Sequence, residues 1–388
     1  MPVPFNYSWR NLWTRRFTTI LTAGGMALVA FVFAAVLMLA EGLEQTLVDT
    51  GSPDNAVVLR AAAETEVSSV IDRSSADVVV VQPQVAQIAE GDPLASKETL
   101  VLVTLPKKDA NKPTNVVVRG IGSQGMNLRS QVKLIAGRNI RPGTHEVIAG
   151  KSIADRIQGA SLDGTLRFAL TDWTVVGIFD AGHTAFNSEL WTDVDQLMAT
   201  FRRNTFSAVI MRVPGERAFN DLKKQLEGDP RLTVQVKREI AFYREQSEVM
   251  SRFIRVLGLA MTLFFSLGAI LGAMVTMYTA VANRTQEIGT LRALGFSRRH
   301  VLAAFLIESL FLGLIGGAVG IGTASLLQFL TISTMNWETF SELAFGFELT
   351  SSIALYTLGF ALIMGLVGGL LPSWRASRLQ IVDALRAE

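Results

Sequence analysis

The sequence predicts a membrane α-helical protein with four transmembrane helices and a large α+β periplasmic domain inserted between helices 1 and 2. Four long apolar stretches predict the helices, because a bilayer core needs roughly 20 apolar residues in helical form. Short runs of valine and leucine, separated by Pro and Gly, predict strands between the first two stretches. The chain is 49% hydrophobic and only 18% charged, which excludes a disordered chain, a coiled coil and an ordinary soluble enzyme.

The four apolar stretches are residues 17–40, 256–283, 301–330 and 349–374. Three of them are uncharged, and the third carries one charge, Glu308. A cleaved signal peptide is the alternative for the first stretch, but the run from 17 to 40 exceeds the usual apolar region of about 7–15 residues and no clear cleavage site follows. We therefore expect a retained membrane helix.

Arginine is concentrated beside these stretches in three segments, 1–16, 284–300 and 375–388. The positive-inside rule places all three in the cytoplasm, as an N-terminal segment, a loop and a tail. The short loop 331–348 carries Glu338, Glu342 and Glu348 without Lys or Arg, which suits the outer side. Both termini are therefore predicted to be cytoplasmic.

The insert, residues 41–255, forms more than half of the chain and lies outside the membrane in this arrangement. It holds 26 basic and 27 acidic residues, so no nucleic-acid partner is expected. Its β-rich runs are Val78–Val81, Leu100–Val103 and Val116–Val118. A strand–helix–strand unit follows, with a strand at Phe206–Val213, a helix at Arg217–Leu226 and a strand at Leu232–Val236.

Both ends of the insert read as helical stalks. Glu41–Asp49 continues the first span with helix-compatible residues, and Arg238–Arg255 leads into the second span without Pro or Gly. A flexible tether is the alternative, but it would be richer in Gly, Ser and Pro. We expect rigid connections to the membrane.

The segment 284–300 predicts a short helix between the second and third spans. Gly295 stands where a left-handed C-cap ends a helix, and Ser297 can cap the next one. The composition leaves two interpretations open: docking of a partner protein, or a helix in the lipid headgroup layer. The residues that form its apolar side and its nearby charges are Ile288, Leu291, Leu294, Glu287 and Arg292.

Glu308 lies about 10 Å inside the third span, where a carboxylate is costly unless it faces protein or water. It could link the short helix to movement of the span, act as a proton-sensitive group, or form a structural pair with a neighbouring arginine or helix end. Small residues at helical spacing predict close helix packing, within the chain or at a dimer seam. These pairs are Gly268 and Gly272, Gly313 and Gly317, Gly316 and Gly320, and Gly365 and Gly369.

The string Arg284–Gly295, with the Ser297-Arg-Arg that follows it, resembles the hallmark of the MacB/FtsX-like ABC permease family. Leu371–Arg378 and Val382–Arg386 are similar to the closing motif of that family, and Glu146–Ala154 and Trp173–Asp180 resemble its periplasmic core. The resemblance covers the whole length and the order of the spans. It implies that the segment contacts an ATPase subunit through Glu287, Ile288, Gly289, Leu291, Arg292, Ala293, Leu294 and Gly295.

The resemblance also implies the partners and the location. We expect a multi-pass protein of the bacterial inner membrane, in contact with membrane lipids. It would form a homodimer with a second permease copy and could work with a periplasmic adaptor and an outer-membrane channel. MacB itself has a fused ATPase, whereas no G-x-x-x-x-G-K-[ST] occurs here, so a separate ABC ATPase subunit is expected to bind ATP and Mg²⁺.

No catalytic residue, metal site or cofactor site is predicted for this chain. Gly150-Lys151-Ser152 lacks the first glycine of a phosphate loop, and the histidines are scattered. The main hypothesis is a permease subunit that transmits ATP-driven motion to export or extract a lipid, lipoprotein, peptide or hydrophobic compound. The alternatives are a lipoprotein-release permease and an FtsX-like signalling subunit that activates a cell-wall hydrolase.

Overall fold

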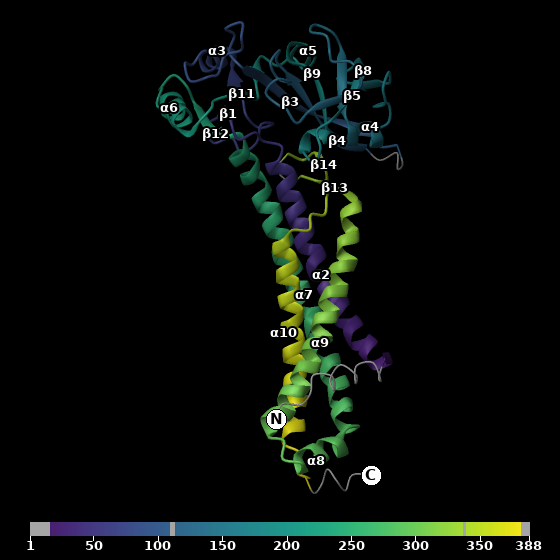
Figure 1. The fold of residues 1–388 in the computed structure, drawn as a ribbon. Coiled ribbons are helices and arrows are strands. Elements are labelled where there is room, and N and C mark those ends of the chain that lie inside the picture. The colour runs from purple at the N-terminus through teal and green to yellow at the C-terminus, as the bar shows by residue number, and fades with distance from the viewer. Residues whose placement is uncertain (1–15, 109–112, 337–338, 382–388) are drawn as a thin grey trace. The chain divides into compact units, whose positions relative to one another are not determined.

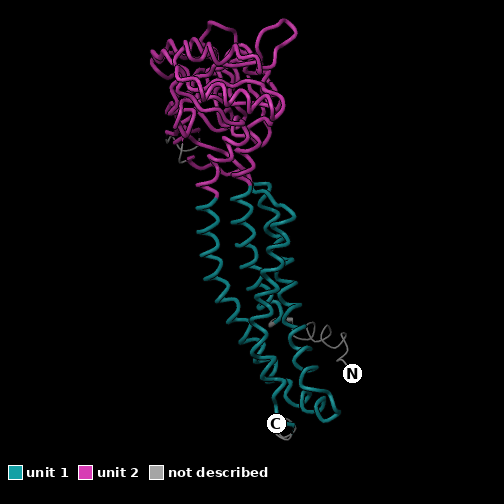
Figure 2. Tube along the Cα trace, turned by 90° about the vertical axis from the view of Figure 1, so that its left-hand side faces the viewer, with its two compact units in different colours: residues 1–41, 252–330, 347–388 teal, residues 42–251, 331–346 magenta. Residues whose placement is uncertain are grey.

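The computed structural model describes residues 16–108, 113–336 and 339–381. These residues form two compact units (Figure 2). Among the described residues, the helical unit comprises 16–41, 252–330 and 347–381. The sheet unit comprises Gly42–Ser251 and Thr331–Gly346, so each unit is built from separate pieces of the chain.

Four helices are long and apolar enough to cross a membrane, as the sequence predicts. The chain is therefore a membrane protein, and the helical unit also contains the short helix α8 (Figure 1) and the 3-10 turn η2. The second long helix begins with 17 residues, Glu239–Arg255, that precede the predicted span. The bounds are α2 Arg16–Val48, α7 Glu239–Ala282, α8 Thr285–Ala293, α9 Arg298–Ser325, η2 Leu326–Phe329 and α10 Ser351–Ser377.

Glycines allow α9 and α10 to approach backbone to backbone. A Cβ added at Gly313 would lie 2.6 Å from the carbonyl oxygen of Ala361, and one at Gly365 would lie 2.6 Å from that of Ser309. Gly317 and Gly369 also face the neighbouring helix closely, while Gly316 and Gly320 face α2. A Cβ at Gly268 or Gly272 would meet nothing within 4 Å, so this pair has no packing role within the described chain.

The sheet unit is built on a ten-stranded sheet of order β12-β1-β11-β3-β4-β9-β6-β8-β5, with β7 also paired to β8. Neighbours are mostly antiparallel; β4 with β9 and β6 with β8 are parallel. The strands are β1 Asn55–Arg60, β2 Ile71–Asp72, β3 Ala95–Pro106, β4 Pro113–Ile121, β5 Lys133–Gly137, β6 Glu146–Gly150, β7 Thr165–Phe168, β8 Thr171–Asp180, β9 Glu189–Asp193, β10 Thr205–Phe206, β11 Ala208–Arg212, β12 Val234–Arg238, β13 Thr331–Met335 and β14 Glu342–Gly346. The helices are α3 Arg73–Val80, α4 Lys151–Arg156, η1 Ala185–Ser188, α5 Val194–Thr200 and α6 Glu216–Glu227.

Separate apolar clusters stabilise the two ends of this sheet. Near β12, the helix α6 buries Phe219, Leu222 and Leu226 at the i, i+3, i+7 spacing of an amphipathic helix. Toward β8, buried Trp173 and Trp191 belong to two further clusters. The predicted strand–helix–strand unit is confirmed as β11, α6 and β12, in which both strands pair with β1.

Two predictions differ from the structure. Val78–Val81, predicted as a strand, lies mostly in α3, because Ala76 and Val79 are buried one helical turn apart and this packing outweighs the β-propensity of valine. The connection 331–348, predicted as a short loop, contains the hairpin β13–β14, which belongs to the sheet unit. The runs Leu100–Val103 and Val116–Val118 are strands as predicted, within β3 and β4.

Candidate coupling site and buried charge cluster

The helix α8 ends in a well-defined capping turn. Gly295 has φ +93°, the left-handed conformation expected at this position. The Phe296 amide donates to the Leu291 carbonyl at 3.1 Å, and the Gly295 amide donates to that of Arg292 at 3.2 Å. These two bonds form a Schellman motif, which fixes the turn into α9. Ser297 is the N-cap residue of α9, but its hydroxyl pairs with His300 Nδ1 at 2.8 Å rather than with a backbone amide.

The apolar side predicted for α8 is divided between interior and surface. Ile288 is only 2% exposed and belongs to the core of the helical unit, and Gly289 is buried beside it. Leu294 is 72% exposed, and the Glu287 side chain is 56% exposed. The prediction that all three apolar residues face a partner is therefore wrong for Ile288, because the helix uses its first turn to pack on its own unit.

The other residues predicted to contact a partner are half-buried or exposed. Leu291 and Arg292 are half-buried, and Ala293 and Gly295 are exposed. The surface that α8 offers is thus centred on Glu287 and Leu294, which lie two helical turns apart on one side. A charged group and an apolar group at this spacing suit both predicted roles, contact with a protein surface and a position in the lipid headgroup layer.

Arg284, the N-cap residue of α8, links α8 to α9. Its Nη1 donates to the Glu308 carboxylate in α9 at 2.8 Å, and its Nε lies 3.7 Å from Glu287. Its guanidinium also lies 5.5 Å from the ring centroid of Phe305. Arg284 and Glu308 are 5% and 9% exposed, so the carboxylate inside the third span is compensated by an opposite charge. Of the interpretations open for Glu308, a structural pair with a neighbouring arginine matches this geometry.

Several predicted features fall outside the described residues. These are most of the cytoplasmic N-terminal segment, residues 1–15, and the end of the tail, residues 382–388, with the Val382–Arg386 motif. The part of the closing motif that is described, Leu371–Arg378, forms the last turns of α10.

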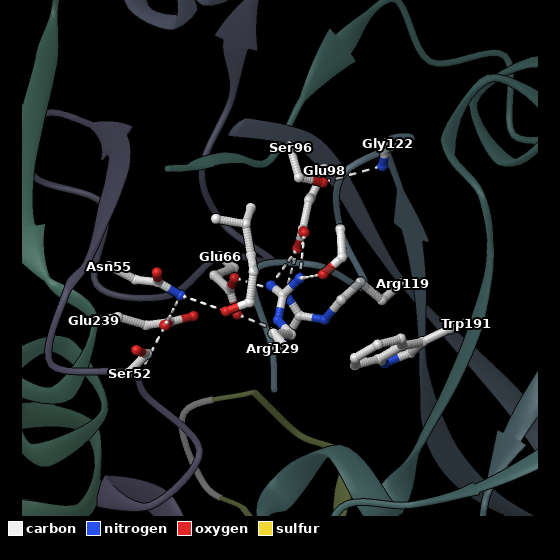
Figure 3. A network of polar contacts seen from close by, with 12 residues as sticks. Ser52, Asn55, Glu66, Ser96, Glu98, Arg119, Gly122, Arg129, Trp191 and Glu239 are labelled. Carbon is white, nitrogen blue, oxygen red and sulfur yellow. Dashed lines mark hydrogen bonds and ion pairs between the residues drawn. The ribbon is translucent and has the colours of Figure 1, made fainter. Parts of the chain in front are cut away.

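A second site, which the sequence analysis missed, is a cluster of buried charges in the sheet unit (Figure 3). Arg119 on β4 is 1% exposed and donates to three carboxylates. Its Nε and Nη2 bond Glu189 at 2.7 and 2.8 Å, its Nη1 and Nη2 bond Glu66 at 2.8 and 3.0 Å, and its Nη1 bonds Glu98 at 2.9 Å. Such charge-assisted, multidentate bonds fix the relative positions of the strands and loop that carry them.

Arg129 completes the cluster from the other side of Glu98. It is fully buried and bonds both oxygens of Glu98, at 2.6 and 2.8 Å. Its guanidinium lies 5.0 Å from the Phe186 ring and 5.4 Å from the Trp191 ring. Burial opposes ionisation of Glu98, but the charges of Arg129 and Arg119 outweigh it and lower the pKa of this carboxyl. Glu98 is therefore held as a carboxylate.

The cluster also binds the ends of the two long helices that enter the sheet unit. Glu239, the first residue of α7, accepts bonds from the Ser52 amide and from Asn55 Nδ2, both at 2.9 Å. Tyr243, one turn further along α7, donates to Glu66 at 3.4 Å. The chain just after α2 and the start of α7 are thus tied to the same polar core.

One signal in the sequence could have revealed this cluster. Arg119 directly follows the valine run of β4, and the last six residues of this strand are all buried. A charged residue inside such a strand requires a buried partner. The partners themselves could not be read from the sequence, because they lie 21 to 70 residues away.

The segment Gly150-Lys151-Ser152 is explained by packing. A Cβ at Gly150 would lie 2.4 Å from the Asn187 carbonyl oxygen, so glycine is required where β6 meets α4. Lys151 pairs with Asp180 at 3.3 Å. Within residues 16–108, 113–336 and 339–381, no group of three or more His, Asp and Glu residues is placed to hold a metal ion.

Four membrane helices, a large inserted α/β domain and a short helix between the second and third spans are the features of an ABC-type membrane permease. Comparison with known families agrees: residues 19–229 match the MacB-like periplasmic core domain, and residues 259–381 match the FtsX-like permease C-terminal family. The chain belongs to the MacB/FtsX-like permease family.

Three relatives illustrate the similarity. The chain is 26% identical to the Bacillus subtilis ABC transporter permease YknZ, over 71% of each chain. It is 23% identical to the probable syringafactin export ATP-binding/permease protein SyfD of Pseudomonas syringae, over 98% of this chain and 58% of that protein. It is 30% identical to the macrolide export protein MacB of Syntrophobacter fumaroxidans, over 53% of this chain and 27% of that protein. The chain thus spans less than two thirds of the length of the two ATP-binding/permease relatives.

Proposed function

We propose that this chain is the permease subunit of an ABC exporter, in which a separate cytoplasmic ATPase drives a conformational change of the sheet unit. The observation that carries the proposal is the helix α8, whose Glu287 and Leu294 are exposed while Arg284 at its start is tied to Glu308 in α9. A partner that moved α8 would pull on α9 through this buried ion pair. The chain itself needs no catalytic residue for this role.

The proposed orientation follows from the arginine distribution. The start of α9 carries Arg298 and Arg299, and Arg375 and Arg378 stand at the end of α10 and just after it, which supports a cytoplasmic side for both. The sheet unit then lies in the periplasm of a bacterium, with the four long helices in the inner membrane. In this orientation α8 faces the compartment that contains ATP.

The proposed partners follow from the same arrangement. ATP and Mg²⁺ would be bound by the partner ATPase, and a second permease copy would complete a homodimer. A periplasmic adaptor and an outer-membrane channel are further candidates. Relatives are named for export of macrolides, syringafactin and pyoverdine. We therefore propose export of a lipid, lipoprotein, peptide or hydrophobic compound, in preference to activation of a cell-wall hydrolase.

Co-purification from the native membrane tests the ATPase partnership. The tagged full chain should recover a P-loop ATPase, identified by mass spectrometry and by its activity. Glu287→Ala and Leu294→Asp should each reduce that recovery at least about tenfold, because a single contact at an interface centre is worth about 1–2 kcal/mol or more. Leu170→Asp is the matched control, since Leu170 is 93% exposed in the sheet unit. Recovery of no ATPase, or equal recovery with all variants, would refute the proposal.

A further inference from the structure

The hairpin β13–β14 connects α9 to α10 along the chain, yet it is part of the sheet unit. The sheet unit is also continuous with α2 and α7, which supply its first and last residues in the segment Gly42–Ser251. The hairpin is therefore the third place at which the chain passes between the two units. Whether this connection can transmit force depends on the contacts that hold the hairpin in the sheet unit.

The side chain of Glu342 on β14 holds the hairpin. Its Oε2 accepts from Lys107 Nζ at 2.8 Å and from Thr114 Oγ1 at 2.6 Å. Its Oε1 accepts from Arg156 Nη2, which also donates to Ser333 on β13. The carboxylate is only 9% exposed, so water competes poorly for these bonds. Burial opposes ionisation, but the bonds from Lys107, Thr114 and Ser333 and the charge of Arg156 lower the pKa of Glu342.

Further contacts extend along the hairpin. The Ala344 amide donates to Ser188 Oγ at 3.1 Å, and Asn115 Nδ2 donates to the Phe340 carbonyl at 3.0 Å. Leu343 and Phe345 are 4% and 3% exposed. The hairpin is thus attached by charge, by hydrogen bonds and by apolar burial, rather than lying loosely on a surface.

The space beneath the hairpin does not suit a cargo molecule. A cavity of about 40 Å³ lies between residues of the hairpin, such as Ser341 and Glu342, and residues of the buried cluster, such as Glu66 and Arg119. This volume has room for a water molecule or two and for nothing larger. The described residues under the hairpin thus enclose no pocket of cargo size.

We infer that β13–β14 is a third mechanical attachment of the sheet unit, through which the α9–α10 pair acts on it, and that Glu342 is its positioning residue. The close backbone packing of Gly313 and Gly365 makes α9 and α10 move together. Arg284 and Glu308 connect the first turn of α8 to α9, and α9 leads along the chain to the hairpin. This role in transmission rests on the proposed function, whereas the attachment itself does not.

The attachment is tested without any partner protein. The chain contains no cysteine, so Leu343→Cys gives a single reporter that is protected while the hairpin is docked. In the full chain in detergent, adding Glu342→Gln should accelerate maleimide labelling of this reporter at least about tenfold, because a buried bonding partner has been removed. Glu348→Gln, at a carboxylate in the same connection but outside the hairpin, is the matched control. Equal labelling rates with Glu342→Gln and with Glu348→Gln would overturn the attachment.

Hydrogen exchange of β13–β14 in the cysteine-free chain provides the same test if the cysteine reporter disturbs folding. Glu342→Gln should speed exchange in β14 while exchange in α6, far along the sheet order, stays as in the wild type. Unchanged exchange in β14 would again overturn the attachment.

Transmission is tested in the complex with its ATPase. Hydrogen exchange is compared with and without Mg²⁺ and a non-hydrolysable ATP analogue. In the wild type, nucleotide should alter exchange in α8 and in β3. Glu342→Gln should keep the change in α8 but lose at least about half of the change in β3. If α8 of the wild type does not respond, the proposed function fails. If α8 responds and Glu342→Gln leaves the β3 response intact, transmission through the hairpin fails.

An engineered disulfide tests whether re-attaching the hairpin restores transmission. Ser188→Cys with Ala344→Cys places two thiols where a hydrogen bond now joins the hairpin to η1. In the Glu342→Gln background, oxidation should restore the β3 response and reduction should remove it again. Failure of the oxidised protein to recover, with the disulfide verified by mass spectrometry, would contradict transmission through the hairpin.

Discussion

Arg284 and Glu308 form an ion pair of 2.8 Å between the start of α8 and the middle of α9, and both side chains are almost completely buried. The two partners are not equivalent. Arg284 has a second carboxylate, Glu287, at 3.7 Å, and Glu287 is half-exposed. Removal of the arginine therefore leaves Glu308 more isolated than removal of Glu308 leaves the arginine.

This asymmetry predicts which of two substitutions destabilises the helical unit more. Arg284→Met should destabilise the helical unit by about 3–5 kcal/mol, the usual cost of an uncompensated buried charge. Glu308→Gln should cost less, about 1–3 kcal/mol, because the amide can still accept a bond and Glu287 remains nearby. Thermal unfolding of the full chain in detergent measures both. The double variant Arg284→Met/Glu308→Met should regain much of the loss, and a double variant less stable than Arg284→Met would argue against a pairwise interaction.

The bonds from Arg119 to three buried carboxylates make it a sensitive position of the sheet unit. Arg119→Met would leave the carboxylates of Glu66, Glu98 and Glu189 close together, without the cation that bonds all three. We expect a loss of at least about 3–5 kcal/mol or failure to fold. Denaturant unfolding followed by near-ultraviolet circular dichroism detects it, since Trp173 and Trp191 are buried in this unit.

Arg167→Met is the control for this prediction. The Arg167 side chain is 74% exposed and lies 3.8 Å from the exposed Asp172, so its loss should change the unfolding midpoint very little. Equal effects of the two substitutions would mean that the cluster does not support the fold.

The pairing of Glu146 with Arg138 predicts that the sheet unit loses stability at acid pH. Hydrogen bonds from the Arg138 side chain lower its pKa to about 2, against a small opposing effect of burial. Because the folded state lowers this pKa from 4.5, its contribution to stability is present above about pH 4.5 and is lost as the pH falls toward about 2. Glu146→Gln should therefore be less stable than the wild type near neutral pH, and the difference should vanish toward about pH 2.

Unfolding of both proteins between about pH 3 and about pH 7 checks this expectation. Glu90→Gln, at an exposed carboxylate of the same unit, controls for the loss of one negative charge. A stability difference that stayed constant over the whole pH range would show that the Arg138 pairing does not depend on ionisation of Glu146.

Substitution by alanine should have opposite effects at two glycines of the helical unit. Gly365→Ala should destabilise the unit by about 1–3 kcal/mol, because its Cβ would meet the backbone of α9. Gly268→Ala meets nothing within 4 Å and should be neutral or slightly stabilising in the isolated chain, since alanine favours helix. Thermal unfolding distinguishes them. A Gly268→Ala variant that stays stable but no longer dimerises would place this face at a seam between two copies.

Features that depend on local sequence were predictable. The length and apolarity of the spans predicted four membrane helices, and the alternation of charged and apolar residues in Arg217–Leu226 predicted α6. Gly295 was predictable as a cap because a left-handed residue must end α8 at that point. The valine run of α3 was misread because burial of one helical face outweighed intrinsic preference.

Features that depend on distant contacts were not predictable. Glu342 bonds residues 186 and 228 positions earlier in the chain, so nothing around it in the sequence distinguishes it from Glu348. The same holds for the burial of Ile288, which belongs to an apolar cluster with residues of α2, α7, α9 and α10. Long-range placement of charged and apolar groups, rather than their local pattern, gives each of these residues its role.

The split composition of the sheet unit has a consequence for biogenesis. Its first segment, Gly42–Ser251, is synthesised before α7, α8 and α9 are complete, whereas Thr331–Gly346 follows them. Lys107 and Arg156 therefore leave the ribosome long before their shared carboxylate partner, because the helices α5 to α9 are synthesised before Glu342. The sheet unit is completed only when the third span has already been translated, so synthesis of the membrane helices and completion of the sheet unit are obligatorily interleaved.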